Sequence, residues 1–216
     1  MTECNVGTKL FNTNEDIAHE TKKMLFYTSD TPLERNNAWG DEPLPKTNDM
    51  IRLYYQNING VQSTSNWNKW RDIIHEISAN QVDILGLVET NINWNPARNK
   101  QALNVLRTQH KHSILLNATS DEISKSFHKP GGASLAILGN AISTISEKHT
   151  DETGLGRWVY TILTGKNHRK IVIITAYRLC QNSLPRGYET AYSQQYRILR
   201  RQNVTNPKSN SCSTKT

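Results

Sequence analysis

An unbroken run of apolar and small residues, I-L-G-L-V at 84–88, lies between two acidic residues. A short run without alternation is typical of a strand that is buried on both faces. Residues 50–58 are rich in Leu and Tyr and lead into the turn signal Asn59-Gly60, which predicts another strand. Between the two, residues 66–79 place apolar side chains on one helical face, namely Trp67, Trp70, Ile74 and Ile77. The pattern therefore predicts a strand–helix–strand unit with both tryptophans in its core.

The pattern further along predicts one more helix and then several strands. Asn95 suits a helix N-cap and Pro96 a first turn, so we expect a helix over 95–107. Beyond it, strand-like runs occupy 113–118, 133–138, 141–146, 158–163 and 170–176. The turn at Gly139-Asn140 and the link at 165–168 are short enough to make the later strands antiparallel. A final amphipathic helix is expected over 188–201, with Tyr188, Tyr192, Gln195 or Tyr196, and Leu199 on one face.

The two ends of the chain lack any sustained hydrophobic period. Residues 1–48 are polar, and residues 202–216 contain mainly Asn, Ser, Thr and Lys. The hydrophobic content of the whole chain is only 36%. Low hydrophobicity of this kind leaves too little apolar surface to order a segment. We therefore expect a disordered leader at 1–48, a folded domain at 49–201 and a disordered tail at 202–216.

The positive charge is concentrated towards the end of the sequence. The net charge is +7, and residues 165–216 hold ten Lys or Arg but only one acidic residue, Glu189. Such a segment suits a polyanion such as nucleic acid. A basic segment that is simply solvated fits the same charges, so both interpretations stand at this point.

The sequence also bears on location. No apolar run reaches 18 residues, and the first residues lack the pattern of a secretory signal. Cys4, Cys180 and Cys212 are far apart, which indicates reduced thiols rather than a disulfide framework or a zinc site. We therefore expect an intracellular protein, in the nucleus or elsewhere in the cell, with no membrane partner. The oligomeric state is not predicted.

Polar side chains stand where the two strands of the predicted unit end. Asn57 closes the first strand and Glu89 follows the second. Ligands of strand–helix–strand units gather at the carboxyl ends of the strands. A carboxylate there is costly unless a metal ion or an arginine neutralises it. The alternative is that Glu89 caps the following loop in solvent.

Four stretches together resemble a known superfamily. They are Y-Q-N-I-N-G at 55–60, D-I-L-G-L-V-E-T-N at 83–91, P-G-G-A-S-L-A-I-L at 130–138 and I-T-A-Y-R at 174–178. In order and approximate spacing they resemble the first half of the endonuclease/exonuclease/phosphatase domain, the fold of apurinic endonucleases and DNase I. The endonuclease domains of non-LTR retrotransposons are the most similar type. The resemblance covers about residues 50–200.

The resemblance implies a fold, a reaction and a site. The fold would be α+β, a partial four-layer α/β/β/α sandwich with its C-terminal half missing. The reaction would be Mg²⁺-dependent (or Mn²⁺-dependent) cleavage of a phosphodiester, with DNA as the expected partner. Glu89 and Asn57 would be catalytic metal ligands, and Tyr177 would contact the scissile phosphate. Arg157 and Arg178 are candidate phosphate-binding residues, each with a solvated or structural alternative, whereas Gly131-Gly132 would allow close backbone packing.

Part of the superfamily pattern is absent from this sequence. A G-D-x-N motif, a later Asp and a final His are expected after the I-T-A-Y strand. The residues after Tyr177 include no Asp and no His. Because catalytic groups that act as a unit cannot be lost singly without a large loss of rate, we expect an inactive, truncated endonuclease fragment. Two alternatives stay open: a phosphoesterase of the same fold that acts on small or lipid phosphates, and a non-catalytic remnant that binds nucleic acid.

Overall fold

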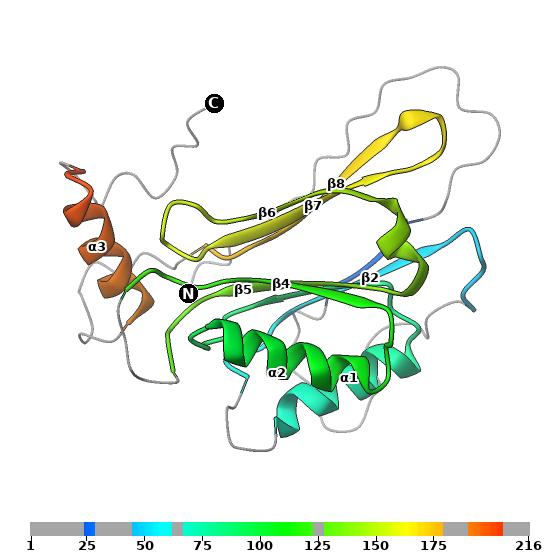
Figure 1. The fold of residues 1–216 in the computed structure, drawn as a ribbon, viewed down its shortest axis with the longest axis horizontal. Coiled ribbons are helices and arrows are strands. Elements are labelled where there is room, and N and C mark those ends of the chain that lie inside the picture. Colours follow the sequence, from blue (N-terminus) through cyan, green and yellow to red (C-terminus); the bar gives the residue numbers. More distant parts are fainter. Residues whose placement is uncertain (1–23, 29–44, 62–66, 123–127, 179–189, 205–216) are drawn as a thin grey trace.

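Two stacked β-sheets and a layer of helices form the body of the protein (Figure 1). The computed structural model describes residues 24–28, 45–61, 67–122, 128–178 and 190–204. In chain order the elements are β1 (Met24–Thr28), β2 (Ile51–Asn57), α1 (Asn68–Ala79), β3 (Ile84–Val88), α2 (Pro96–Arg107), β4 (Ser113–Ala118), β5 (Ala133–Leu138), the 3-10 helix η1 (Gly139–Thr144), β6 (Ile145–Thr150), β7 (Trp158–Thr164), the 3-10 turn η2 (Lys166–His168), β8 (Lys170–Ala176) and α3 (Ala191–Arg201).

The larger sheet has the strand order β1-β2-β3-β5-β4. β2 and β3 are parallel neighbours joined by α1, which confirms the predicted strand–helix–strand unit. β3 lies in the middle of the sheet, and every one of its residues is buried. Leu85 and Leu87 belong to the core beneath the helices, whereas Ile84 belongs to the core between the sheets. The unbroken apolar run is therefore explained by burial on both faces.

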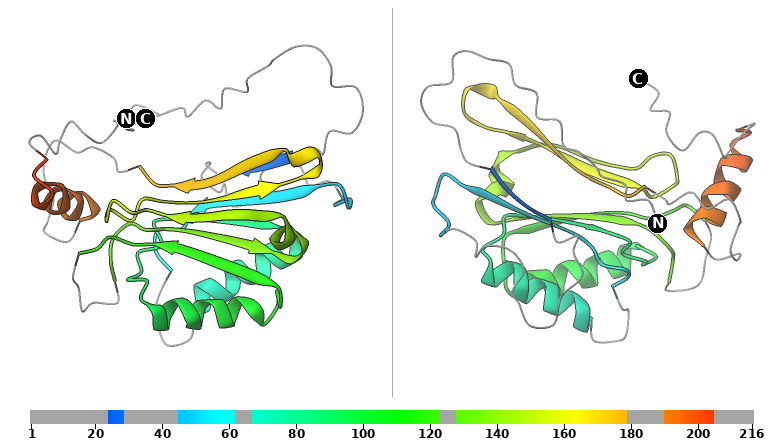
Figure 2. Two further views of the ribbon diagram at one scale, coloured as in Figure 1. Left: turned by 45° about the horizontal axis from the view of Figure 1, so that its top comes forward. Right: turned by 180° about the vertical axis from the view of Figure 1, so that it is seen from behind.

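Helices α1 and α2 cover the outer face of the larger sheet (Figure 2). Asn95 caps α2 as predicted, because its Oδ1 accepts a hydrogen bond of 2.9 Å from the backbone N–H of Arg98. Trp70 is fully buried, and its indole N–H donates to the carbonyl oxygen of Ala102 at 3.0 Å. Trp67 is also buried and stacks on Trp94. Both tryptophans are core residues, as expected.

The smaller sheet has the order β6-β7-β8 and is antiparallel throughout. Val159 and Leu163 of β7 pack against Leu135 and Ile137 of β5, and these residues form the core between the two sheets. The alternate residues of β7 point away from that core, as the period of a strand requires. The described chain is thus a mixed α+β sandwich of three layers, in the order helices, larger sheet, smaller sheet.

The structure corrects two sequence-based assignments. Residues 141–146 were expected to form a strand, but η1 occupies most of this segment and β6 begins only at Ile145. The β-branched residues Ile142, Thr144 and Ile145 make this segment resemble a strand, yet this short helical turn leads the chain from the larger sheet to the smaller one. The leader at 1–48 was expected to lie outside the fold, but β1 lies within it and pairs in parallel with β2. Its M-L-F-Y-T sequence is a short β-prone run in polar surroundings.

The remaining elements agree with the prediction within a few residues. α3 begins at Ala191 rather than 188, because Thr190 caps it by accepting a hydrogen bond from the backbone N–H of Ser193. Tyr188 lies outside the described residues, as do most of the two ends expected to be disordered and all three cysteines. No helix in the described part of the chain combines the length and apolarity needed to cross a membrane.

Candidate phosphodiester-cleaving site

Asn57 and Glu89 lie at the same edge of the larger sheet. Asn57 is the last residue of β2 and pairs with Val88, the last residue of β3, so Glu89 is one step beyond this pair. Both side chains reach the solvent-facing end of the sheet, since Asn57 is exposed and Glu89 is half-buried. The parallel register therefore brings an amide and a carboxylate to one edge, as the sequence predicted.

The backbone around these residues is shaped by hydrogen bonds between the two strand exits. The N–H of Gly60 donates to the carbonyl oxygen of Glu89 at 2.6 Å, and the N–H of Val61 donates to that of Thr90 at 2.8 Å. Asn57 Oδ1 accepts a hydrogen bond of 3.1 Å from the N–H of Asn59. Glu89 has a φ of 53°, a conformation that is uncommon outside glycine and is typical of constrained sites.

The smaller sheet brings Tyr177 to the same end of the molecule. Thr175 of β8 lies directly over Gly86 of β3, because a Cβ built on Gly86 would lie 2.7 Å from Thr175 Oγ1. The hydroxyl of Tyr55 in β2 donates to the carbonyl oxygen of Ala176 at 3.1 Å. Tyr177 follows Ala176 at once and is half-buried. The carboxyl ends of β2, β3 and β8 therefore meet at one end of the sandwich.

Arg157 is a buried cation beside Tyr177. Its guanidinium carbon lies 5.5 Å from the centroid of the Tyr177 ring, and the N–H of Tyr177 donates to the Arg157 carbonyl oxygen at 2.8 Å. Only 9% of the residue is exposed. Arg157 Nη2 donates to the carbonyl oxygen of Ala191 at 3.0 Å, whereas Nε and Nη1 have no hydrogen-bond acceptor among the described residues.

Burial also changes the electrostatics of Arg157. Desolvation lowers the pKa of the guanidinium to about 10, and the interactions with Tyr177 and Asp151 oppose this decrease. Arg157 therefore remains charged at neutral pH. A buried positive charge with two nitrogens that lack an acceptor is costly unless an anion completes its coordination. Guanidinium donors bind oxygen-rich anions such as phosphate well.

Gly131 and Asn91 hold Arg157 in place. Gly131 has a φ of +88°, and any Cβ there would collide with Arg157 Nη1. Asn91 Oδ1 accepts a hydrogen bond of 2.8 Å from the N–H of Gly131, and the Asn91 side chain packs against Gly60. One asparagine thus connects the exits of β2 and β3 to the glycine that supports Arg157. The predicted close packing at Gly131-Gly132 is confirmed.

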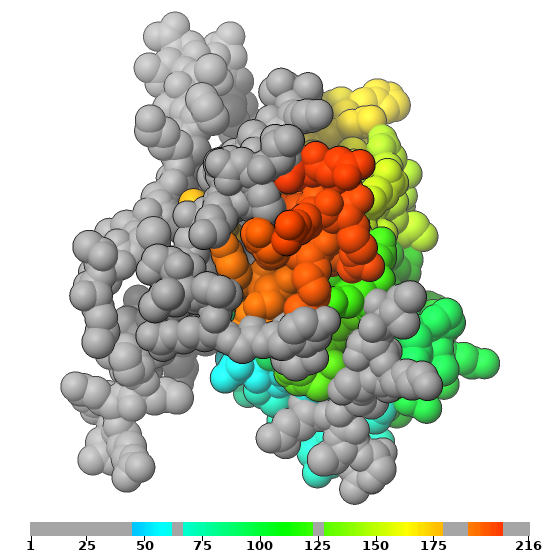
Figure 3. Space-filling model, turned by 90° about the vertical axis from the view of Figure 1, so that its left-hand side faces the viewer, coloured from blue at the N-terminus to red at the C-terminus, as the bar shows by residue number. Residues whose placement is uncertain are grey.

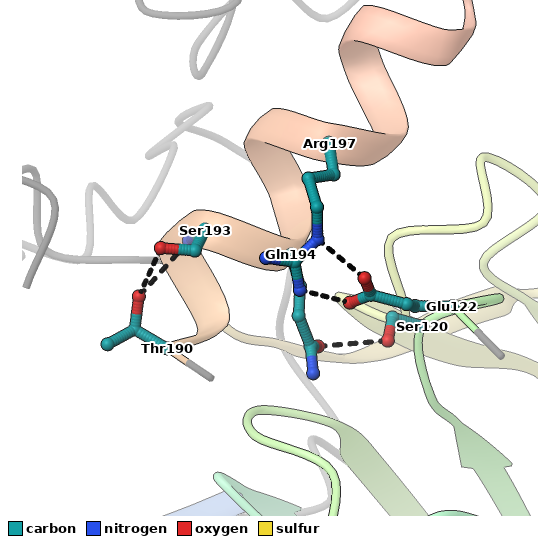
Figure 4. Close-up of polar contacts among 6 residues, drawn as sticks. All are labelled: Ser120, Glu122, Thr190, Ser193, Gln194 and Arg197. Atoms are coloured by element: carbon teal, nitrogen blue, oxygen red, sulfur yellow. Dashed lines mark hydrogen bonds and ion pairs between the residues drawn. The ribbon is translucent and has the colours of Figure 1, made fainter. Parts of the chain in front are cut away.

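Helix α3 is docked against residues 120–122 by polar side-chain contacts (Figure 4). The hydroxyl of Ser120 donates to Gln194 Oε1 at 3.0 Å, and Arg197 forms two hydrogen bonds with the carboxylate of Glu122, at 2.6 and 2.8 Å. Lys129 donates to the carbonyl oxygen of Ser120. Burial lowers the pKa of the Lys129 ammonium, and the charges of Asp121 and Glu122 oppose this effect. α3 is therefore part of the same end of the molecule.

The predicted site residues fall into two groups. Asn57 and Glu89 stand at the exits of neighbouring strands of the larger sheet, whereas Arg157 lies beside Tyr177, and exposed Arg178 follows Tyr177 directly. Sequence reasoning missed three residues that support them: Asn91, Asp151 and Thr175. Asp151 accepts a hydrogen bond of 2.6 Å from the N–H of Arg157. Asn91 has a positive φ of 54°, which Asn tolerates better than most residues do. Its residue type was therefore the one signal in the sequence for this backbone position.

The residues at the strand exits fit a hard metal ion with few protein ligands. Mg²⁺ is commonly held by one or two carboxylates, with waters and substrate phosphate completing its shell. Glu89 and Asn57 offer oxygen donors of this kind. Within the described ranges no three His, Cys, Asp or Glu side chains are grouped as metal ligands.

Comparison with known proteins gives matches of fold only. No family model matches this sequence, and no curated protein matches it. Its fold is similar to that of endonuclease/exonuclease/phosphatase proteins. The AP endonuclease LMAP from Leishmania major matches with 16% identity and a TM-score of 0.41, over 59% of this chain and 40% of that one. An AP endonuclease from Archaeoglobus fulgidus matches with 15% identity and a TM-score of 0.38, over 60% and 41% of the two chains.

A third solved structure carries the superfamily name itself. The endonuclease/exonuclease/phosphatase family protein from Leptotrichia buccalis matches with 14% identity and a TM-score of 0.41, over 69% of this chain and 62% of that one. This chain spans about two fifths of the length of the two AP endonucleases.

Proposed function

We propose that this chain carries the metal-binding and phosphate-binding part of a Mg²⁺-dependent site that cleaves phosphodiesters in nucleic acid, of the retroelement endonuclease type. The observation that carries the proposal is the environment of Arg157. It is a buried guanidinium with two N–H-bearing nitrogens that lack an acceptor in the described structure, and it lies beside Tyr177. A phosphate oxygen is the natural acceptor for such donors.

Each residue has a distinct role in this proposal. Glu89 and Asn57 hold the metal by their side-chain oxygens. Such an ion would supply charge stabilisation at the phosphoryl oxygen and would ease deprotonation of a water. Arg157 and the Tyr177 hydroxyl bind the phosphate from the side of the smaller sheet, and exposed Arg178 contacts a neighbouring phosphate.

Binding and cleavage are separable in this chain. No Asp or His follows Tyr177 in the 216 residues, and such groups would be needed to orient the attacking water. We therefore expect the chain alone to bind metal and DNA without cleaving DNA. Binding without cleavage is also the expected behaviour under the alternative that the protein is a non-catalytic nucleic-acid-binding module.

The metal assignment is tested by titrating the chain with Mn²⁺ and following free Mn²⁺ by electron paramagnetic resonance. Glu89→Gln removes the carboxylate charge with little change of shape, so we expect Mn²⁺ affinity to fall at least about tenfold. The matched control is Glu152→Gln, which alters an exposed acid. Unchanged affinity in Glu89→Gln, or equal losses in both variants, would show that Glu89 is not the ligand.

The substrate class is tested by competition. A fluorescent DNA oligonucleotide is bound in the presence of Mg²⁺ and then displaced by unlabelled DNA or by an inositol phosphate. Displacement by DNA at much lower phosphate concentration supports nucleic acid. Equal displacement by the small phosphate would support the phosphoesterase alternative instead.

A further inference from the structure

We propose that the last turn of α3, through Arg200 and Arg201, binds the phosphodiester backbone of nucleic acid next to the site. This inference rests on the proposed function for the identity of the ligand. It adds a second contact surface, which is distinct from the phosphate contacts of Arg157, Tyr177 and Arg178.

The side of α3 that carries these arginines bears a shallow groove. Tyr196, Arg197, Arg200 and Arg201 line it. Residues four apart are neighbours on a helix surface, so Arg201 lies beside Arg197 and Arg200 beside Tyr196. Arg197 is already neutralised by Glu122. Arg200 and Arg201 are exposed, and their guanidinium groups have no ion pair within the described part of the chain.

The opposite side of α3 fixes this groove relative to the site. Arg157 donates to the carbonyl oxygen of Ala191, the first residue of α3, and Gln194, Ile198 and Leu199 are buried. α3 occupies the middle of the end face shown in Figure 3. Its 11 residues span roughly 15 Å at a rise of 1.5 Å per residue. That length is about four base-pair steps of 3.4 Å, so a nucleic acid backbone that follows α3 would pass several phosphates along the helix.

The chemistry of the groove favours a chain of phosphates. Arginine presents a planar fork of donors that matches phosphate oxygens. α3 contains three arginines and no acidic residue. The helix dipole favours cations at the C-terminal end of α3. This interaction does not occupy the N–H groups of Arg200 and Arg201, so these groups can donate hydrogen bonds to a ligand.

A second basic cluster provides a matched control. Lys166 and Arg169 are exposed at the link between β7 and β8. Because β8 runs from this link to Tyr177, the link lies at the opposite end of the smaller sheet from the site (Figure 1). Removing two charges there changes the net charge as much as removing them from α3, but does so far from the proposed path.

The experiment measures binding of a fluorescently labelled DNA duplex by anisotropy over a range of salt concentrations. EDTA is present, so metal binding and cleavage do not contribute. We expect Arg200→Gln/Arg201→Gln to lower affinity about tenfold or more and to reduce the slope of log K against log salt by about 1.8, since each phosphate contact contributes about 0.9. We expect Lys166→Gln/Arg169→Gln to keep the slope of the unaltered chain.

Three results would overturn the inference. Equal loss of slope in both double variants would indicate attraction by net charge alone. No loss in the α3 variant would place DNA elsewhere. Displacement of DNA by polyglutamate at equal charge concentration would identify an acidic polypeptide as the preferred ligand. Failure of the proposed function is distinguishable, because it appears in the Mn²⁺ titration of Glu89→Gln, whereas this assay contains no free metal.

Discussion

The two sheets of the sandwich are covered differently. The larger sheet is packed on both faces, against α1 and α2 on one side and against β7 on the other. The smaller sheet is packed on one face only by the described elements (Figure 2). On its outer face Val172 is 51% exposed and Ile174 is 58% exposed. Packing on two faces therefore fixes the position of the larger sheet more strongly than packing on one face fixes the smaller sheet.

Because of this difference, the candidate site residues beside the larger sheet should be held more firmly than those beside the smaller sheet. Asn57 and Glu89 stand on strands of the doubly covered sheet. Arg157 and Tyr177 flank strands of the smaller sheet, and their distance from Glu89 depends on the interface between the sheets and on the hydrogen bond between Asn91 and Gly131. The contacts of Gly86 with Thr175 and of Tyr55 with Ala176 set that distance. Stability and site geometry should therefore respond differently to changes in each sheet.

The largest difference is expected for matched tryptophan substitutions. Trp70→Ala removes a fully buried side chain beneath α1 and α2, so we expect the free energy of unfolding to fall by about 3–5 kcal/mol. Trp158→Ala removes a half-buried ring on the outer face of the smaller sheet, which stacks on Tyr160 at 5.6 Å. We expect a loss of about 1 kcal/mol there. Denaturant unfolding measures both, and similar losses would contradict the difference in cover.

A smaller effect is expected where the two sheets touch. Gly86→Ala places a Cβ 2.7 Å from Thr175 Oγ1 and 2.9 Å from Tyr55 Cδ2, so the sheets must move apart locally. We expect a loss of about 1–3 kcal/mol in the free energy of unfolding. Thr175→Ala removes the nearer atom, and the double variant should therefore lose less than the sum of the single losses.

The control for this interface is Gly165→Ala. A Cβ on Gly165 would have only the Arg169 carbonyl oxygen within 4 Å, at 3.8 Å, and its φ is −96°. We expect a change within about 0.5 kcal/mol. If Gly86→Ala were as mild as this control, or if Thr175→Ala gave no relief, the close approach of β3 and β8 would not hold in solution.

Local patterns predicted the larger sheet well because its signals lie close together in sequence. The helical period of 66–79 and the apolar run of 84–88 each determine one element, and the parallel register then places Asn57 beside Glu89. The assignment of 141–146 failed because its β-branched residues favour a strand locally, whereas most of the segment forms a 3-10 helix between the two sheets. β1 was missed because five β-prone residues are a weak signal within a long polar segment.

The environment of Arg157 could not be predicted from sequence. Its burial depends on Gly131, which lies before β5, and on Ala191, which is 34 residues further along the chain. Neither partner shares a local pattern with the L-G-R-W segment. Long-range packing also separates the basic residues of 165–216, since those of η2 and α3 lie at opposite ends of the smaller sheet. The sequence predicted a basic segment, whereas the structure places only part of it near the site.

The smallest effect is expected on the outer face of the smaller sheet. Ile174→Thr replaces an exposed side chain by another β-branched residue, so we expect the free energy of unfolding to change by less than about 0.5 kcal/mol. The control is Ile84→Thr in fully buried β3, where the new hydroxyl lies in the core between the sheets and a loss several times larger is expected. Thermal or denaturant unfolding of both variants makes the comparison. A large loss for Ile174→Thr would mean that other polypeptide covers this face in solution, and the contrast between the two sheets would then disappear.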